Sequence, residues 1–338
     1  VLVGPGTYTG EGNYNIYFNG KAVTLRSIEG ADSTIIDCEH ISGRRGLVFE
    51  PHGSYPGETE ATVIEGFTIR NGYFSNGTDG GGIYISNASP VFNNCIIRDN
   101  EVYHSTNNSH PHGGGIWINN SSSSFTNCSI LDNKTDAQVN HGGGYSAYSY
   151  GSGIFITGTS SIIMDSSLVS GNWSYGNDIN NADESRAYMC GGGIYLESGT
   201  LTLANSEVSN NKTDGEGSQQ TREGAGLFVA GGTANISYTI FDHNLLSQGI
   251  YISGGTATMD QSVIADNGGQ GLYRNDGSMA VSNTIIWGNN NNDSGDISYS
   301  YCDRQGSPPD GEGNISKDPW FMDSGSGDYR LLPGSVSI

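Results

Sequence analysis

The residues Gly82-Ile83-Tyr84-Ile85, followed by Asn94-Cys95-Ile96-Ile97-Arg98-Asp99-Asn100, form the unit of sequence that decides the fold. The first half, a glycine followed by aliphatic, aromatic and aliphatic residues, recurs along the chain. Full copies begin at Gly82, Gly115, Gly153, Gly193, Gly226 and Gly249, Gly271-Leu272-Tyr273 is a shorter copy, and Gly46-Leu47-Val48-Phe49 is an earlier version. The second half ends in asparagine each time, at Asn100, Asn133, Asn172, Asn211, Asn244, Asn267 and Asn289. Internal repetition of this kind is typical of a solenoid.

The length of the repeat selects the kind of solenoid. The two shortest intervals, from Gly226 to Gly249 and from Gly249 to Gly271, span 23 and 22 residues, enough for three short strands with their turns. Strands this short cannot bury a face alone and must stack on their own copies. A propeller blade needs about 40 residues, and no apolar 3.6-residue period favours a helical fold. We predict an all-β, right-handed parallel β-helix of about ten coils, with equivalent residues stacked about 4.8 Å apart.

We predict one domain over residues 1–338, with N-terminal coils at 1–45, repeat coils at 46–290 and a truncated C-terminal cap at 291–338. Between Gly82 and Gly226 the intervals are longer than the last two, and the excess always follows the terminal asparagine. These insertions occupy residues 101–113, 134–152, 173–191 and 212–225. They should leave the solenoid by one edge as stacked loops that form a lobe, and insertions on a single face often mark a binding surface. The alternative is a lobe that only covers the edge.

Stacked equivalent residues should form ladders along the axis. The terminal asparagines can hydrogen-bond along their column through the side-chain amide, and Asn tolerates left-handed backbone geometry. A second column holds small residues: Cys95, Cys128, Ser167, Ser206, Thr239, Ser262 and Thr284. We expect Cys95 and Cys128 to be neighbouring buried thiols, because side chains stacked in register suit a disulfide poorly.

The net charge of the chain limits the classes of molecule that it can bind. The chain carries 35 Asp and Glu against 14 Lys and Arg, a formal charge of −21. Such a field repels phosphate backbones and anionic membranes, so we expect no nucleic-acid partner. Neutral glycans, cationic surfaces or Ca²⁺ fit better, and calcium is the one cofactor that the composition leaves open. The five cysteines lack zinc-like spacing, so we predict no metal–thiolate site and assign no residue as a metal ligand. No apolar run approaches the ~20 residues of a transmembrane helix, so we expect no membrane insertion within this chain.

Several segments resemble those of known proteins. The sequences VLVGPGTY at residues 1–8, KAVTLRS at 21–27 and STIID at 33–37 look like the first coils of secreted bacterial β-helix proteins. The Gly-Gly-Gly-Ile-Tyr and Asn-Cys-x-Ile-x-x-Asn repeats are similar to those of polymorphic outer-membrane, adhesin-type proteins and of the pectin-lyase-like superfold. The sequence DPWF at 318–321 resembles the terminal cap of this group.

This resemblance implies export in bacteria to the cell surface or the medium. It implies no single activity, because the superfold carries lyases, hydrolases, phage spikes and adhesins. The chain has no signal peptide and opens at Val1-Leu2-Val3 as if inside a strand. We therefore take it for a mature piece or fragment whose targeting and anchoring sequences lie elsewhere.

The repeat also places aromatic residues on one face. In Gly-Ile-aromatic-Ile the aliphatic residues share one side and the aromatic residue takes the other. If the aliphatic residues fill the core, an aromatic stripe lines the outside: Tyr84, Trp117, Phe155, Tyr195, Phe228, Tyr251 and Tyr273. Ring faces spaced in this way could stack on sugars. The alternative is that the insertions fold back and cover the stripe as a second hydrophobic cluster, above all at Phe155 and Phe228.

We predict a protein that binds extracellular polysaccharide or a surface protein through the stripe and the lobe. The candidate ligand-binding residues are Tyr84, Trp117, Tyr195, Tyr251, Tyr273, Trp173 and Tyr175. The first alternative is a polysaccharide lyase or glycoside hydrolase acting in the same cleft, although no signature fixes a catalytic residue. Its candidates are His141, Glu184, Arg186 and Arg222, with Asp183 and Glu223 as further carboxylates. Lys134 and Lys212, both in Asn-Lys-Thr-Asp, are expected to be solvated turn residues. The second alternative is a structural spacer or filament subunit.

Overall fold

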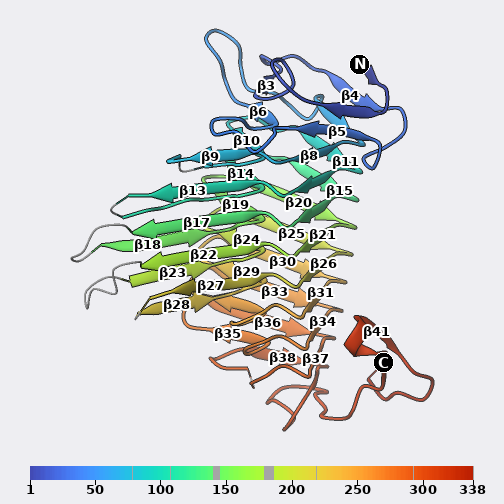
Figure 1. Cartoon of the computed structure of the whole chain (residues 1–338). Helices are drawn as coiled ribbons and strands as arrows, with labels where there is room; N and C mark the ends of the chain where they lie inside the picture. Colours follow the sequence, from blue (N-terminus) through green and yellow to red (C-terminus); the bar gives the residue numbers. More distant parts are fainter. Residues whose placement is uncertain are drawn as a thin grey trace.

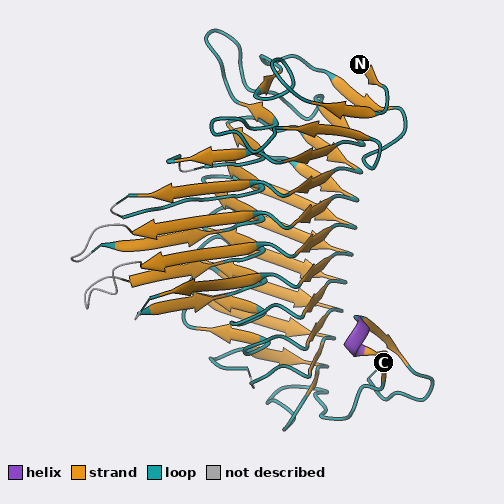
Figure 2. Ribbon diagram, viewed as in Figure 1, coloured by secondary structure: helices purple, strands orange, loops and turns teal. Residues whose placement is uncertain are grey.

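The computed structural model describes residues 1–77, 79–106, 108–139, 145–178, 186–217, 219–291 and 293–337. In these ranges three long sheets run the length of the molecule, and neighbouring strands within each are parallel (Figure 1). Neighbours in a sheet come from successive coils, so the chain winds as a right-handed parallel β-helix, as predicted. Strands dominate, and the short helix η1 (Ser324–Ser326) lies near the C-terminus (Figure 2).

Sheet I contains the Gly-Ile-aromatic-Ile segments and has nine strands in the described ranges. They are β3 (Ile16–Tyr17), β6 (Leu47–Phe49), β10 (Ile83–Ser86), β14 (Ile116–Asn119), β19 (Ile154–Thr157), β24 (Ile194–Leu196), β29 (Leu227–Val229), β32 (Ile250–Ile252) and β35 (Leu272–Arg274).

Sheet II follows sheet I in each coil and has eleven strands among the residues that the structure places. They are β1 (Leu2–Val3), β4 (Thr24–Ser27), β7 (Val63–Glu65), β11 (Val91–Asn93), β15 (Ser124–Thr126), β20 (Ser161–Asp165), β25 (Thr200–Ala204), β30 (Thr233–Ser237), β33 (Thr256–Asp260), β36 (Ser278–Ser282) and β38 (Ser298–Ser300).

Sheet III closes each coil and also has eleven strands in the part of the chain that is described. They are β2 (Gly6–Tyr8), β5 (Thr34–Asp37), β8 (Thr68–Arg70), β12 (Ile96–Arg98), β16 (Ser129–Leu131), β21 (Leu168–Ser170), β26 (Glu207–Ser209), β31 (Ile240–Asp242), β34 (Val263–Ala265), β37 (Ile285–Trp287) and β39 (Asp303–Arg304). Strands β38 and β39 continue the solenoid past residue 290, into the segment expected to form the cap.

The insertions stack on one edge, as predicted, but as regular strands rather than loops (Figure 2). The chain leaves the coils along the outgoing sheet: β9 (Tyr73–Ser75), β13 (Glu101–Ser105), β17 (Lys134–Val139), β22 (Trp173–Asp178) and β27 (Lys212–Glu216). It comes back along the returning sheet: β18 (Ser146–Tyr150), β23 (Arg186–Cys190) and β28 (Gln220–Glu223). A thin core of Ala137, Val139, Ala147, Ala187 and Met189 lies between these two sheets of the lobe.

The asparagine ladder is continuous. The side-chain Nδ2 of Asn133 donates to Oδ1 of Asn172 at 3.0 Å, and Asn172 donates to Asn211 at 2.9 Å. Each amide also donates to a main-chain carbonyl inside the coil, as Asn172 does to Ile130 at 2.9 Å. These side chains are fully buried, so the ladder satisfies groups that would otherwise lose their water partners.

The left-handed backbone lies one residue earlier than expected. The residue before the ladder asparagine has the positive φ, for example Asp99 at 55° and Asp132 at 52°. The ladder asparagines themselves are absent from the positive-φ residues of the described chain. The asparagine is therefore selected by its amide hydrogen bonds and not by its tolerance of left-handed geometry.

The repeated glycine packs against this ladder. A Cβ on Gly153 would lie 2.5 Å from the carbonyl oxygen of Gly193 and 3.0 Å from Cγ of Asn172. Gly193 and Gly226 are equally close to the next ladder asparagines. The glycine and the asparagine of the repeat thus require one another, which explains why they recur together.

The second ladder and the core also follow the sequence pattern. Cys95 and Cys128 are buried free thiols, as predicted, and the backbone N–H of Cys128 donates to Oγ of Ser167 at 3.1 Å. The aliphatic residues of sheet I, such as Ile83, Ile116 and Ile154, are fully buried inside the coils. No helix in the described ranges has the length and apolar character needed to cross a membrane.

The chain ends in the antiparallel hairpin β40 (Phe321–Asp323) and β41 (Asp328–Leu331), which lies beside the lower coils (Figure 1). The hydroxyl of Tyr329 donates to the carboxylate of Asp266 at 3.1 Å and lies 3.4 Å from Oδ2 of Asp242. The hairpin is thereby attached to the side of sheet III.

Candidate functional site

The aromatic stripe stands on the outer face of sheet I, in the predicted register. Tyr84 pairs with Trp117, and Phe155, Tyr195 and Phe228 follow in successive strands. The rings stack on one another: those of Phe155 and Tyr195 are 5.1 Å apart and those of Tyr195 and Phe228 are 4.9 Å apart, nearly parallel in both cases. Because the ring faces meet each other, this part of the stripe has no face left for a sugar.

The middle of the stripe is also covered by the lobe. Tyr195 is 9% exposed and Tyr251 is 7% exposed, and both pack with Cys190 of the returning sheet. Tyr150 of the same sheet lies 4.9 Å from the ring of Tyr195. The expectation that Tyr195 and Tyr251 are open to a ligand is wrong, because the insertions fold back over them. Phe155 is covered in the same way, so the alternative of a second hydrophobic cluster describes this region.

Three stripe residues near the ends of the column, Tyr84, Trp117 and Tyr273, are half-buried. Tyr84 stacks on Trp117 at 4.7 Å, and the guanidinium of Arg45 lies 5.1 Å from the Tyr84 ring. Tyr273 stacks on Tyr251 at 4.9 Å. Each of these rings therefore has at least one face occupied, and a ligand-binding role for them stays a prediction.

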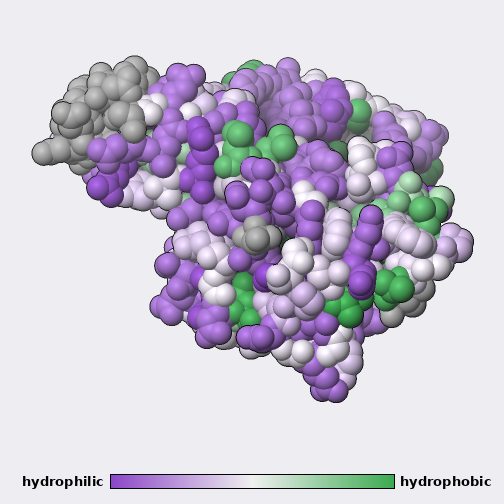
Figure 3. Space-filling model, turned by 90° about the horizontal axis from the view of Figure 1, so that it is seen from below, coloured by the Kyte–Doolittle hydropathy of each residue, from purple (hydrophilic) through white to green (hydrophobic). Residues whose placement is uncertain are grey.

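A corner lies between the returning sheet and sheet I. Viewed from below, the lobe projects from the body and the surface is hollowed between them (Figure 3). The side chains of the returning sheet that alternate away from the lobe core include Tyr148, Tyr188 and Glu223. The rings of Tyr148 and Tyr188 stack at 4.9 Å, so this column also presents ring edges.

Glu223 sits at the base of this corner. Its carboxylate lies 3.9 Å from the thiol of Cys190 and is hydrogen-bonded to the hydroxyl of Tyr251. Burial raises the pKa of Glu223 above its ordinary value, although the bonds from Tyr251 and Cys190 act in the opposite direction. Burial and the charges of Cys190, Glu197 and Glu223 raise the pKa of Tyr195.

The candidates for an enzyme do not assemble in the described structure. His141, Asp183 and Glu184 lie outside the described residues. Arg186 is exposed, with Nη1 at 3.3 Å from the hydroxyl of Tyr188, on the corner side of the returning sheet. Arg222 aligns with the buried Met189 and pairs with Asp214 at 3.1 Å. The two arginines thus point to opposite faces of one sheet and cannot clamp a single substrate carboxylate.

The outer face of the outgoing sheet, which we call the lobe face, gathers the remaining candidates. Lys134, Trp173 and Lys212 are register partners in three successive strands, and so are Asp136, Tyr175 and Asp214. Their side chains alternate with those of the lobe core, which points them outward. Trp173 and Tyr175 are half-buried, with ring centroids 5.0 Å apart in an edge-to-face arrangement.

The two lysines are strand residues beside aromatic rings, which corrects the expectation of solvated turns. The Nζ atom of Lys134 lies 5.2 Å from the ring centroid of Trp173 and that of Lys212 lies 4.5 Å from it, so the indole is flanked by two cations. The Nζ atom of Lys134 is also 5.2 Å from the ring of Tyr175. The recurrence of Asn-Lys-Thr-Asp was the signal that could have identified this arrangement.

Each lysine is neutralised within its own strand. Lys134 contacts Asp136 at 2.6 Å, and Lys212 contacts Asp214 at 2.8 Å. Burial lowers the pKa of Lys134, but Asp136 and Glu101 outweigh burial and raise it overall. Burial acts against the charged form of Asp214 too, yet the hydrogen bond from Lys212 gives it a lowered pKa. At neutral pH the lobe face therefore carries charged donors and acceptors, and its carboxylates, which include Glu101 and Glu216, outnumber its two lysines.

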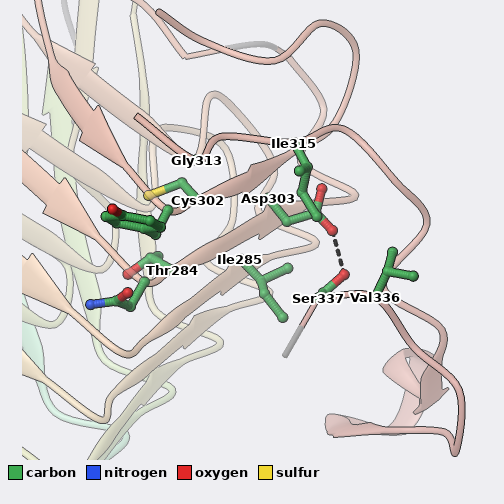
Figure 4. A pocket seen from close by; sticks show the side chains of 10 residues that line it. Thr284, Ile285, Cys302, Asp303, Gly313, Ile315, Val336 and Ser337 are labelled. Atoms are coloured by element: carbon green, nitrogen blue, oxygen red, sulfur yellow. Dashed lines mark hydrogen bonds between the residues drawn. The ribbon is translucent and has the colours of Figure 1, made fainter. Parts of the chain in front are cut away.

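A separate cavity of about 280 Å³ lies between the last coil and the C-terminal tail (Figure 4). The buried carboxylate of Asp303 accepts a hydrogen bond from the hydroxyl of Ser337 and another, at 2.9 Å, from the backbone N–H of Lys317. These bonds hold the tail against the solenoid. None of the candidate residues lines this cavity, and no cluster of three metal-ligating side chains occurs in the ranges that the structure covers.

A family model described as "Right handed beta helix region" matches residues 13–239, more than half of the chain. No curated protein and no solved structure matches the sequence.

Proposed function

This chain belongs to the right-handed β-helix family, and from that premise we propose that it binds extracellular carbohydrate through the lobe face. The family fixes a fold and leaves the activity to sites grafted on it. The observation that carries the proposal is the cluster of Trp173 and Tyr175 between two lysine–aspartate pairs. Sugars combine apolar CH surfaces with hydroxyl groups, so aromatic side chains beside charged donors and acceptors suit them.

The charge of the chain supports a neutral ligand. At −21 the protein repels acidic polysaccharides at long range. Only four lysines occur in the sequence, and two of them, Lys134 and Lys212, lie on the lobe face in pairs that cancel their charge. Such a surface offers hydrogen bonds to hydroxyl groups without selecting an anion. We place the protein, on this proposal, at a bacterial cell surface or in the surrounding medium, where neutral polysaccharides occur.

The test is binding to a panel of immobilised neutral and acidic polysaccharides. Trp173→Ala should weaken binding to the preferred neutral glycan at least tenfold, equivalent to about 1.4 kcal/mol. Tyr238→Ala is the matched control, because Tyr238 is an exposed aromatic residue on a turn of the solenoid, 55% accessible. Its binding should equal that of the wild type.

Folding of both variants is checked by their circular dichroism spectra and melting temperatures. Equal binding by the wild type and a folded Trp173→Ala variant would reject the lobe face as the site. Binding to a protein surface but to no glycan would favour the partner-protein alternative.

Glu223 favours a second candidate function, glycoside hydrolysis in the corner. A carboxyl group with a raised pKa can serve as a general acid, and Glu197, whose charge together with that of Glu223 raises the pKa of Tyr195, is the candidate for the second carboxylate. Release of reducing ends from a neutral polysaccharide, lost in Glu223→Gln while binding by the lobe face persists, would support it. If no panel member gains reducing ends with the wild type, this candidate is excluded for that panel.

A further inference from the structure

The lobe face repeats itself along the solenoid axis. Strands β17 and β27 both begin with Lys-Thr-Asp, and β22 lies between them in register. Lys134 and Lys212 therefore occupy equivalent positions two strands apart, with Trp173 midway. Adjacent strands are about 4.8 Å apart, so the two lysine–aspartate pairs are separated by roughly 10 Å along the axis.

An extended glycan has a matching period. In an unbranched β-1,4-linked chain each sugar is rotated by about half a turn relative to the last, so every second sugar presents the same hydroxyl groups to one side. The length of two such sugars is close to the separation of the two lysine–aspartate pairs. Helical α-1,4-linked chains curve and do not repeat in this way.

We infer that the lobe face binds an extended, neutral, β-1,4-linked glycan lying parallel to the solenoid axis, an inference that rests on the proposed function. Sugars one and three of a bound segment contact the pairs Lys134–Asp136 and Lys212–Asp214. The sugar between them lies over the outward edge of Trp173, because the two lysines flank the faces of its ring. The proposed binding surface extends along the axis beyond the first pair. Glu101 and Tyr103 of β13 precede Lys134 and Asp136 in the same columns.

The arrangement favours this ligand because the pairs are held in place beforehand. Lys134 is fixed by Asp136 at 2.6 Å and by Glu101 at 3.3 Å, and both lysines rest near Trp173. Side chains that are already ordered lose little conformational entropy when a ligand binds. Two similar contacts on one extended ligand also act together, which raises affinity once both are reached.

The inference predicts a step in affinity with ligand length. Cello-, N-acetylated chito- and β-manno-oligosaccharides from dimer to hexamer are titrated calorimetrically, with maltooligosaccharides of the same lengths for comparison. In the preferred β-linked series the trimer, the shortest chain that reaches both pairs, should bind at least tenfold more tightly than the dimer. The α-linked series should show no such step.

The variant Lys212→Met tests whether the rise in affinity from dimer to trimer comes from the pair Lys212–Asp214. Lys212→Met should bind the trimer no more than threefold better than the dimer, while its dimer affinity stays near the wild-type value. Asp214 keeps Arg222 as a partner at 3.1 Å in this variant, so the substitution does not leave a carboxylate unpaired. Lys21→Met, a change far from the lobe, is the control and should retain the step.

The outcomes separate this inference from the proposed function. If Trp173→Ala abolishes glycan binding but β- and α-linked oligomers behave alike, the proposed function stands and the axial, two-sugar match is wrong. A step that persists in Lys212→Met also overturns it. If the wild type binds none of the oligomers and no polysaccharide, both fail.

Discussion

Replacing Asn172 by alanine tests the asparagine ladder at its centre. The amide of Asn172 donates to Asn211 and to the carbonyl of Ile130, both at 2.9 Å. Its Oδ1 accepts from the backbone N–H and from the side chain of Asn133, both at 3.0 Å. An alanine makes none of these bonds, and the site is closed to water because Asn172 is fully buried.

The magnitude follows from the group left behind. The N–H of Asn133 loses its buried acceptor, and an unsatisfied buried group costs about 1–3 kcal/mol. We therefore expect Asn172→Ala to lower the free energy of unfolding by about 1–3 kcal/mol. That is a large share of the roughly 5–15 kcal/mol by which a typical domain is stable. In a solenoid each coil contacts only its neighbours, so the loss should concentrate around the coils next to residue 172.

Urea unfolding followed by circular dichroism measures the effect, and native-state hydrogen exchange locates it. Asn235→Ala is the matched control: Asn235 points outward from β30, is half-buried and accepts one exposed hydrogen bond from Thr258. The control should change stability by no more than about 0.5 kcal/mol. Equal unfolding midpoints for the two variants, or faster exchange spread evenly over all coils, would refute the role given to the ladder.

Three further expectations concern the core, the corner and the thiols. Gly153→Ala should destabilise the protein by about 1–3 kcal/mol through overpacking, whereas Gly4→Ala, with open space around the new Cβ, should leave the melting temperature unchanged. Because burial raises the pKa of Glu223 above 4.5 in the folded state, its contribution to stability is present at acidic pH and is lost as the pH rises through the folded-state value. Glu223→Gln should remove that fall from a plot of melting temperature against pH, and an identical plot would contradict it. The five buried cysteines should resist a thiol reagent in the native protein and all react in denaturant, and reaction without denaturant would show that a coil opens.

The sequence alone was sufficient to predict the architecture of the coils. Side chains alternate with a period of two along a strand, and a repeat of fixed length brings equivalent residues into one column. The positions of Ile83 and Ile116 in the core, the amide ladder through Asn133 and the small-residue column through Cys128 follow from these two local rules. The shared edge for the insertions follows too, because each insertion sits at the same point of its repeat.

Which side chains are open at the surface, and which are covered, was decided by the tertiary structure. An aromatic residue such as Tyr195 looks the same in a sequence whether its ring is open to solvent or covered. The outcome depends on the direction in which the insertion returns, and that direction is set by long-range packing of Tyr150 and Cys190 onto sheet I. Likewise Lys134 and Lys212 are distant in the chain, and only the pairing of the outgoing strands on either side of Trp173 makes them one surface. Local rules fix which side of a strand a residue faces, but what covers that side depends on contacts between segments far apart in sequence.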